Sequence, residues 1–206
     1  MRLFDPDNAL FRRVGMVADV FGLSILWLFT SAPLFTMALT SAALYDAVYH
    51  SLRLKEGHAY ARFWQSCRQN WRILLPAGLI WGVAAYWLYY AVSLAGALAH
   101  GGDKTAIIIY TAAKILLVIP FGWCVWSVVI LARFRRTLKE AHVLGFKLAL
   151  ASLPSTVVMV LLVVEIFKLG AKYYFTTLVS PVLTAWLLSL FAERIFAKYT
   201  KDDSEH

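Results

Sequence analysis

The sequence has few charged residues and very few cysteines, and each shortage excludes a class of protein. Only 16% of its 206 residues are charged, whereas soluble domains carry roughly 25%. The two cysteines, Cys67 and Cys124, lie in a polar segment and an apolar run, without the paired Cys and His spacing of a zinc site. We therefore expect neither a metal site nor a disulfide.

The sequence also lacks the short motifs that carry catalysis. Its five histidines are scattered, without the spacing of a zinc protease. It has no phosphate-binding glycine loop and no nucleophile elbow. We therefore predict that the protein is not an enzyme and uses no cofactor.

Apolar residues are in excess, at 61% of the chain, with a mean hydropathy of +0.66. One small core cannot hide that much apolar surface, so we expect a lipid bilayer to cover the rest. The eight Trp, ten Tyr and thirteen Phe agree with this, because aromatic rings gather at membrane interfaces. The net charge of +8 does not indicate nucleic acid, since the basic residues form short clusters between apolar runs.

Six apolar stretches are long enough to cross a bilayer, which takes ~20 residues of helix. Continuous apolar runs favour helices, because a lone strand leaves its backbone unpaired in lipid. The sequence therefore predicts an all-α, polytopic membrane protein with a single domain, residues 1–206. The predicted spans are residues 14–31, 33–51, 73–99, 105–132, 152–170 and 173–192. Pro120 and Pro181 fall in the middle of spans, and we expect a kink at each.

Most of the 20 Lys and Arg residues lie before the first span, between the second and third, between the fourth and fifth, and after the sixth. Basic residues concentrate on the cytoplasmic side of membrane proteins. We therefore predict a protein of the bacterial cytoplasmic membrane with both termini inside. Two inner segments, residues 58–72 and 133–150, carry an apolar stripe and a basic face, which predicts amphipathic helices at the inner interface.

Two carboxylates fall inside the first two predicted spans. Asp19 and Asp46 are equally far in sequence from the turn that joins these spans. We therefore expect them at equal depth on adjacent helices, where they would form a proton or ion site or be neutralised by basic residues. The candidate neutralising residues are Arg12, Arg13, His50 and Arg53.

Lys114 and Glu165 are two further charges within predicted spans. Both lie in the outer half of their spans, and those spans should be antiparallel neighbours. An ion pair between them would offset much of the cost of burying each charge. The alternatives are a lysine that reaches the outer interface and a role of both charges in transport.

Several short motifs occur together in the first 72 residues. They are Phe4-Asp5-Pro6-Asp7-Asn8, Asp19, Leu26-Trp27-Leu28, Ser31-Ala32-Pro33-Leu34-Phe35-Thr36, Ala42-Ala43-Leu44-Tyr45 and Phe63-Trp64-Gln65-Ser66-Cys67-Arg68-Gln69-Asn70. This set resembles the YesL family of small bacterial membrane proteins, whose activity is unknown. The resemblance implies structural roles for Pro33, Thr36 and Tyr45. Ala38 and Ala18 stand where glycine is usual in the family, and Asp46 is atypical of it.

The resemblance to YesL proteins also implies a partner, since family members commonly accompany carbohydrate-importing ABC systems. On that basis Phe63, Ser66 and Asn70, on the first inner segment, are candidate contacts with the permease or the ATPase. In the second inner segment, Glu140-Ala141, Gly145 and Leu153-Pro154 are similar to the coupling-loop motif of ABC importer permeases, with shorter spacings and His142 at the second small position. This adds Glu140 and Gly145 to the candidate contacts.

Two functions follow from these patterns. The first is a non-catalytic accessory or assembly subunit of a carbohydrate ABC importer. The alternative is a small stand-alone transporter, as a monomer or a homodimer, in which the charges within the spans act on the substrate.

Overall fold

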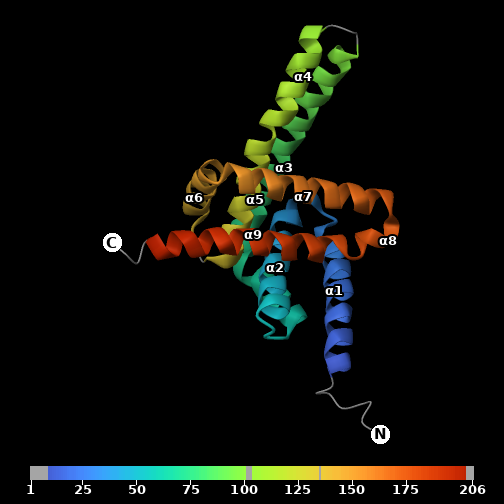
Figure 1. Cartoon of the computed structure of the whole chain (residues 1–206), viewed down its shortest axis with the longest axis vertical. Coiled ribbons are helices and arrows are strands. Elements are labelled where there is room, and N and C mark those ends of the chain that lie inside the picture. The colour runs from blue at the N-terminus through green and yellow to red at the C-terminus, as the bar shows by residue number, and fades with distance from the viewer. Residues whose placement is uncertain (1–8, 101–103, 135, 203–206) are drawn as a thin grey trace.

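The computed structural model describes residues 9–100, 104–134 and 136–202, and every regular element in these ranges is helical (Figure 1). The helices are α1 (Ala9–Ser31), α2 (Met37–Val48), α3 (Ala59–Ala99), α4 (Lys104–Leu116), α5 (Val118–Arg133), α6 (Leu138–Ala151), α7 (Leu153–Lys172), α8 (Tyr174–Thr177) and α9 (Ser180–Asp202). The 3₁₀ turn η1 (Leu34–Thr36) precedes α2, and the π-helical turn η2 (Tyr49–Arg53) follows it. The prediction of an all-α protein is confirmed.

Four helical stretches are long and apolar enough to cross a membrane: Ala59–Ala99, Lys104–Arg133, Leu153–Lys172 and Ser180–Ala197. They coincide with the last four predicted spans, so the chain has the character of a multi-pass membrane protein. Six spans are not shown. The apolar part of α1, Gly15–Ser31, is shorter than these four, and α2 has only 12 residues.

Helix α2 is the centre of the molecule rather than one of its lipid-facing helices. Eight of its residues are buried: Leu39, Thr40, Ala42, Ala43, Leu44, Tyr45, Ala47 and Val48. They contribute to two apolar clusters, one with α5, α6 and α9 and the other with α1, α3 and α9. Small side chains on α2 let the surrounding helices approach closely.

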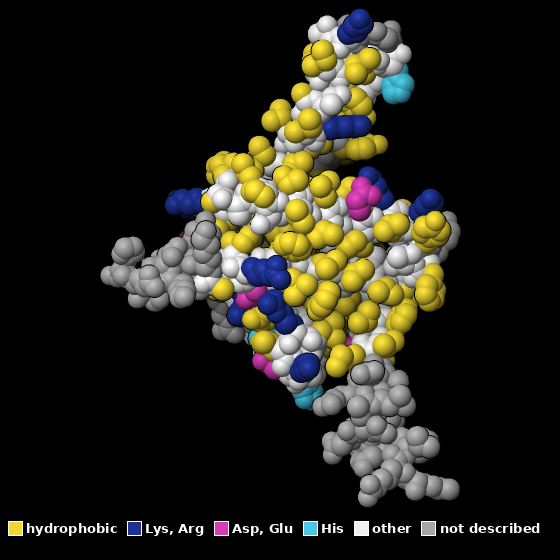
Figure 2. All heavy atoms as spheres, in the orientation of Figure 1, with side chains coloured by type: hydrophobic (Ala, Val, Ile, Leu, Met, Phe, Trp, Pro, Cys, Tyr) yellow, Lys and Arg dark blue, Asp and Glu magenta, His cyan; other side chains and the backbone are white. Residues whose placement is uncertain are grey.

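The end of α3 and the whole of α4 form a hairpin arm that projects from the body (Figure 1). We use "the arm" for residues 86–99 and 104–116, beyond the part of α3 that borders the central core. Its large apolar side chains are exposed on both helices, and no residue of α4 is buried. Figure 2 shows hydrophobic side chains over the arm and over the visible face of α7 and α9, which lie side by side across the body.

Helix α3 corrects one predicted boundary. Residues 58–72 were expected to be a separate interfacial helix, but α3 continues without a break from Ala59 to Ala99. The change from polar to apolar composition near Ile73 does not end the helix, since both compositions suit helical backbone. Pro76 therefore lies inside a helix. The second inner helix does exist as a separate element, α6, but it begins at Leu138, because α5 continues to Arg133.

The two mid-span prolines have different outcomes. Pro120 lies in the first turn of α5, three residues after Leu117, where the helix is interrupted between α4 and α5. The predicted kink at Pro120 stays a prediction. The prediction for Pro181 is wrong, because α9 begins only at Ser180. A proline in the first turn of a helix removes a backbone N–H that has no partner in the helix, so it starts α9 and does not bend it.

Parts of the predicted pattern lie outside the described residues. These are the Phe4-Asp5-Pro6-Asp7-Asn8 motif, Arg2, Arg135 and the side chains of Arg12 and Arg13.

Candidate functional site

The Pro33–Thr36 motif closes the turn between α1 and α2. Pro33 precedes η1 in an extended conformation. The hydroxyl of Thr36 lies 2.6 Å from the carbonyl oxygens of both Thr30 and Pro33, to which it donates. One side chain thus ties the end of α1 to the start of α2 where the backbone has no regular pairing. The motif therefore stabilises the turn between α1 and α2.

Asp46, on α2, belongs to a polar network with η2 and α3, which we call the Asp46 network. Arg62 donates from Nε to Oδ2 of Asp46 across 3.2 Å, and His50 Nε2 lies 3.4 Å from the other carboxylate oxygen. His50 Nδ1 is 2.8 Å from Oε2 of Glu56 in the following loop. Asp46 and His50 are each only 15% exposed, so the network ties η2 to the start of α3.

The Asp46 network bears on one of the two expectations for the paired carboxylates. Asp46 forms an ion pair with Arg62, which was not among the candidates, and His50, which was, lies beside the same carboxylate. Asp19 has a different neighbour, because the Tyr60 hydroxyl donates to the carbonyl of Ala18 beside it, across 3.4 Å. Among the described residues no contact joins Asp19 to Asp46.

A second network lies on the opposite side of η2, and we call it the Arg133 network. Arg133, at the end of α5, donates from Nε to Oε1 of Glu193 on α9 across 3.1 Å. Its Nη2 donates to the Tyr49 hydroxyl across 3.2 Å, and its guanidinium lies 4.5 Å from the centre of the Tyr49 ring. Arg53 donates to the carbonyl of Ser189 across 2.6 Å. Together these contacts join α5, α9 and η2.

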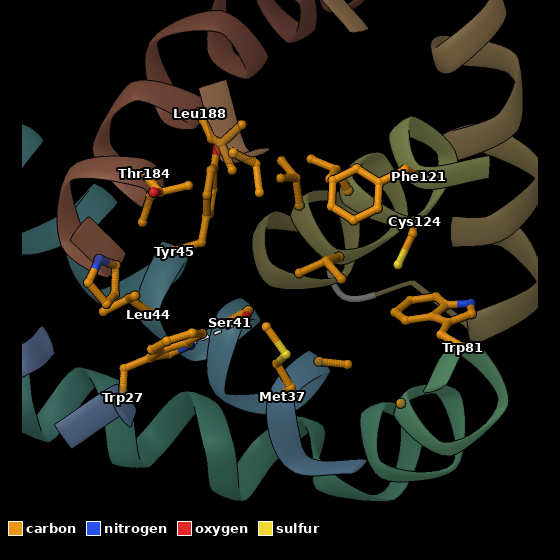
Figure 3. A pocket seen from close by; sticks show the side chains of 18 of the residues that line it. Trp27, Met37, Ser41, Leu44, Tyr45, Trp81, Phe121, Cys124, Thr184 and Leu188 are labelled. Carbon is orange, nitrogen blue, oxygen red and sulfur yellow. Dashed lines mark hydrogen bonds between the residues drawn. The ribbon is translucent and has the colours of Figure 1, made fainter. Parts of the chain in front are cut away.

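A central cavity of about 270 Å³ lies between α1, η1, α2, α3, α5, α7 and α9. Figure 3 shows Trp27, Ser41 and Met37 on one side of it and Phe121, Cys124 and Trp81 on another. Apolar side chains make most of the wall. Ser41 Oγ accepts a hydrogen bond from Trp27 Nε1 across 3.2 Å. Because it combines apolar walls with a few polar groups between the helices of the body, we treat this cavity as the candidate binding site.

Tyr45 forms the end of the cavity that lies next to the Arg133 network. Its side chain is 2% exposed, and its hydroxyl is buried without a hydrogen-bond partner in the described part of the chain. In Figure 3 its ring borders the cavity and its hydroxyl end lies towards Leu188. Tyr49, four residues further along the same helical face, belongs to the Arg133 network. One helical turn therefore separates the cavity from the network.

Trp81 is held at the cavity wall by α6. Its Nε1 donates to Nε2 of His142 across 2.9 Å, while Nδ1 of His142 lies 2.8 Å from the carbonyl of Leu138. Trp123 Nε1 donates to the backbone carbonyl of His142 across 2.8 Å. Since Nε2 accepts from Trp81, Nδ1 carries the proton and donates to Leu138.

The predicted pair of Lys114 and Glu165 does not form. Glu165 pairs with Lys168, one turn along α7, at 2.7 Å. Lys114 Nζ lies 4.1 Å from the centre of the Tyr110 ring, on the arm. Because the arm projects from the body, α4 does not run beside α7 as the span order suggested. Both charges are exposed and belong to local pairs.

The candidate partner contacts on α3 are mostly internal. Phe63 is fully buried and Ser66 is 4% exposed, so neither side chain can meet a partner in this conformation. Asn70 is half-buried. Phe63 packs in the apolar cluster with α1, α2 and α9. The exposed aromatic residues of this stretch are Tyr60, Trp64 and Trp71.

Glu140 and Gly145 have local roles in α6. Glu140 forms a capping box with Thr137, in which each side chain accepts from the backbone N–H of the other residue. Gly145 lets α6 approach α5, since a Cβ there would lie 2.7 Å from Oγ of Ser127. Both residues of the coupling-loop pattern are therefore explained by capping and packing within this chain.

The sequence did not reveal the Arg133 network or the cavity. Arg133 and Glu193 are 60 positions apart, and no short-range pattern marks such a pair. Glu193 does offer one signal, since it is an acid set between apolar residues in α9. Among the described residues, no group of three His, Cys, Asp or Glu side chains could hold a metal ion.

Comparison with known families gives one match. Residues 20–92 match the model of DUF624, described as a protein of unknown function. The chain thus carries a DUF624 domain that runs from Val20 in α1 through α2 to Val92 in α3, within the arm. The match does not carry the name YesL, so that resemblance and its link to ABC importers stay predictions. No curated protein and no solved structure matches the chain.

Proposed function

We propose that this chain is a non-catalytic accessory or assembly subunit of a bacterial carbohydrate ABC importer, bound to the permease subunits within the cytoplasmic membrane. The exposed arm is the observation that carries the proposal. Isoleucine and leucine side chains of α4 are exposed, Ile108, Ile115 and Leu116 each above 60%. The choice of a carbohydrate importer as the partner is based only on the resemblance to YesL proteins.

The arm suits a partner helix better than lipid alone. Its two helices have a tight contact at Gly96, where a Cβ would lie 3.1 Å from the Tyr110 ring. Helices associate in membranes through close packing of small residues and not through the hydrophobic effect. The arm offers exposed small residues such as Ala91 on α3 and Ala112 on α4. A permease helix packed there would add the contacts that the hairpin itself lacks.

In this proposal the chain crosses the membrane six times with both termini in the cytoplasm. The continuous helical stretch η1–α2–η2, residues 34–53, is about 30 Å long and matches the bilayer core. The basic residues Arg53, Arg62 and Arg133 gather around η2, as expected of a cytoplasmic end. Within the body α2 is shielded from lipid by its neighbours.

Co-purification from the native host tests the proposal. A tagged chain extracted in a mild detergent should bring down an importer permease and its ATPase, identified by mass spectrometry. Ala91→Phe and Ala112→Phe place a bulky ring on the arm and should reduce that recovery about tenfold, since close approach is lost. Ala171→Phe, at the exposed end of α7, is the matched control and should leave recovery unchanged. A wild-type protein that purifies alone would contradict the proposal.

The alternative, a stand-alone transporter, is favoured by the central cavity and by the Arg133 network beside it. A transporter must close its binding site on one side while the other is open. The Tyr45 ring forms one end of the cavity, and the Arg133–Glu193 pair lies beyond that ring. Closing one side of the binding site requires groups at such an end. Uptake of a sugar by vesicles that contain only this protein would support the alternative and exclude a purely accessory role.

A further inference from the structure

The central cavity opens on a side that is itself apolar. Its exposed lining residues include Leu34 on η1 at 78%, Phe121 on α5 at 42% and Phe167 on α7 at 39%. Helices α5 and α7 belong to stretches long and apolar enough to cross a membrane. The mouth therefore faces the hydrocarbon of the bilayer.

The inner wall of the cavity offers much apolar surface and few polar groups. Trp27, Trp81 and Val125 line it together with other apolar side chains, and Ser41 and Cys124 are among its few polar residues. Ser41 Oγ accepts from Trp27, and its own hydroxyl hydrogen has no acceptor among the described residues. The Tyr45 hydroxyl also has no partner among the described residues. Two unused hydroxyls cannot replace the hydration shell of a polar solute.

The size and chemistry of the cavity decide what fills it. An apolar cavity of about 150 Å³ stays dry and takes up hydrocarbon molecules of matching size. The present cavity, at about 270 Å³, is larger and open towards lipid. A lipid chain that enters it exchanges one apolar environment for another and gains close contact with aromatic rings.

We propose that the cavity binds one acyl chain of a bilayer phospholipid, which enters between Leu34, Phe121 and Phe167. The chain ends against the Tyr45 ring, next to the Arg133 network. This site goes beyond the proposed accessory role, which concerns the arm.

Photo-crosslinking in defined vesicles tests the acyl-chain site. The purified chain is reconstituted in phosphatidylcholine that contains a small share of phosphatidylcholine with a diazirine in one acyl chain. After illumination, peptides containing Met37, Phe121 or Cys124 should carry the label, as mass spectrometry reports. Label confined to the arm, or to other outer surfaces, would overturn the proposal.

Two variants fill the cavity and one matched variant does not. Gly82 lines the cavity and has open space around its Cα, so Gly82→Leu adds bulk there without a clash. Ala85→Phe does the same one turn away. Each should reduce labelling of the cavity peptides about tenfold. Gly15→Leu, a glycine with equally open space on α1, should leave labelling unchanged. Equal labelling in folded Gly82→Leu and Ala85→Phe proteins would overturn the proposal.

Cys124 provides an independent readout of whether the cavity is dry. In a Cys67→Ala background, a charged methanethiosulfonate should modify Cys124 at least about tenfold more slowly in the folded protein than after denaturation, because a charged reagent does not enter an apolar cavity and the reaction needs the thiolate. Equal rates before and after denaturation would show a water-filled cavity. That result would overturn the acyl-chain site, whatever the outcome of the co-purification experiment on the arm.

Discussion

Arg133, the last residue of α5, donates a hydrogen bond across 3.1 Å to Glu193 in the middle of α9. The Glu193 side chain is 14% exposed and that of Arg133 is 34% exposed. The same guanidinium lies over the Tyr49 ring of η2. A single arginine thus fixes three elements at the end of the cavity formed by Tyr45, although no pair of them is adjacent in sequence.

We expect Arg133→Met to lower stability more than Glu193→Gln does. Methionine leaves a mostly buried carboxylate without its partner, at a cost of about 2 kcal/mol after allowance for partial exposure. Glutamine keeps an acceptor for Arg133 and should cost about half as much. Thermal melting midpoints in detergent measure both. The double variant should lose less than the sum of the two single losses. Full additivity would show that the two side chains do not interact.

The Asp46 network leads to a second prediction, because Arg62 and Arg68 offer a matched pair on α3. Arg62 donates to Asp46, whereas Arg68 is exposed. Arg62→Met should lower stability by about 1–2 kcal/mol through the unpaired, half-buried carboxylate. Arg68→Met should change it by less than about 0.5 kcal/mol. Asp46→Asn added to Arg62→Met should recover part of the loss, since no charge then remains unpaired. Equal melting midpoints for Arg62→Met and Arg68→Met would contradict a role of the Asp46–Arg62 pair.

Apolar run length predicted the last four long helices well, because a membrane helix needs a contiguous apolar stretch and leaves that mark in the sequence. The same signal is less informative at α2. Its composition is that of a span, but its burial comes from neighbouring helices, and burial by protein and by lipid selects the same residues, so a span at α2 stays a prediction. The continuity of α3 across residue 73 was missed for a related reason, since hydropathy reports the surroundings of a helix and not where it ends.

Pairs between distant residues were the least predictable part of the site. Lys114 and Glu165 were matched by assumed depth in neighbouring spans, and this required α4 to pack beside α7. The projecting arm removes that neighbour. His50 was correctly expected near Asp46, because i,i+4 positions adjoin on one helix. Arg62 was not, since its approach depends on the loop that returns the chain from η2 to α3.

Substitution by alanine should lower the stability of the protein at Gly145 and raise it at Gly82. At Gly145 a Cβ would press on Ser127, so Gly145→Ala should separate α6 from α5 and cost about 1–3 kcal/mol. At Gly82 a Cβ meets open space, so Gly82→Ala should gain up to about 1 kcal/mol from helix propensity. Melting midpoints of the two variants should therefore move apart. If Gly145→Ala instead kept its stability but lost a co-purifying partner, residue 145 would be a contact and not a packing position.

Thr36 tests whether the Pro33–Thr36 motif serves the turn between α1 and α2. Thr36→Val keeps the shape of the side chain and removes the hydroxyl that donates to the carbonyls of Thr30 and Pro33. Loss of that bond, with two carbonyls left without this partner, should cost about 1 kcal/mol. Thr36→Ser keeps the hydroxyl and should retain most of the stability. The melting midpoint of Thr36→Val should therefore fall below that of Thr36→Ser. The reverse order would mean that the methyl group matters at this position, and that the motif is maintained by packing rather than by the hydrogen bond.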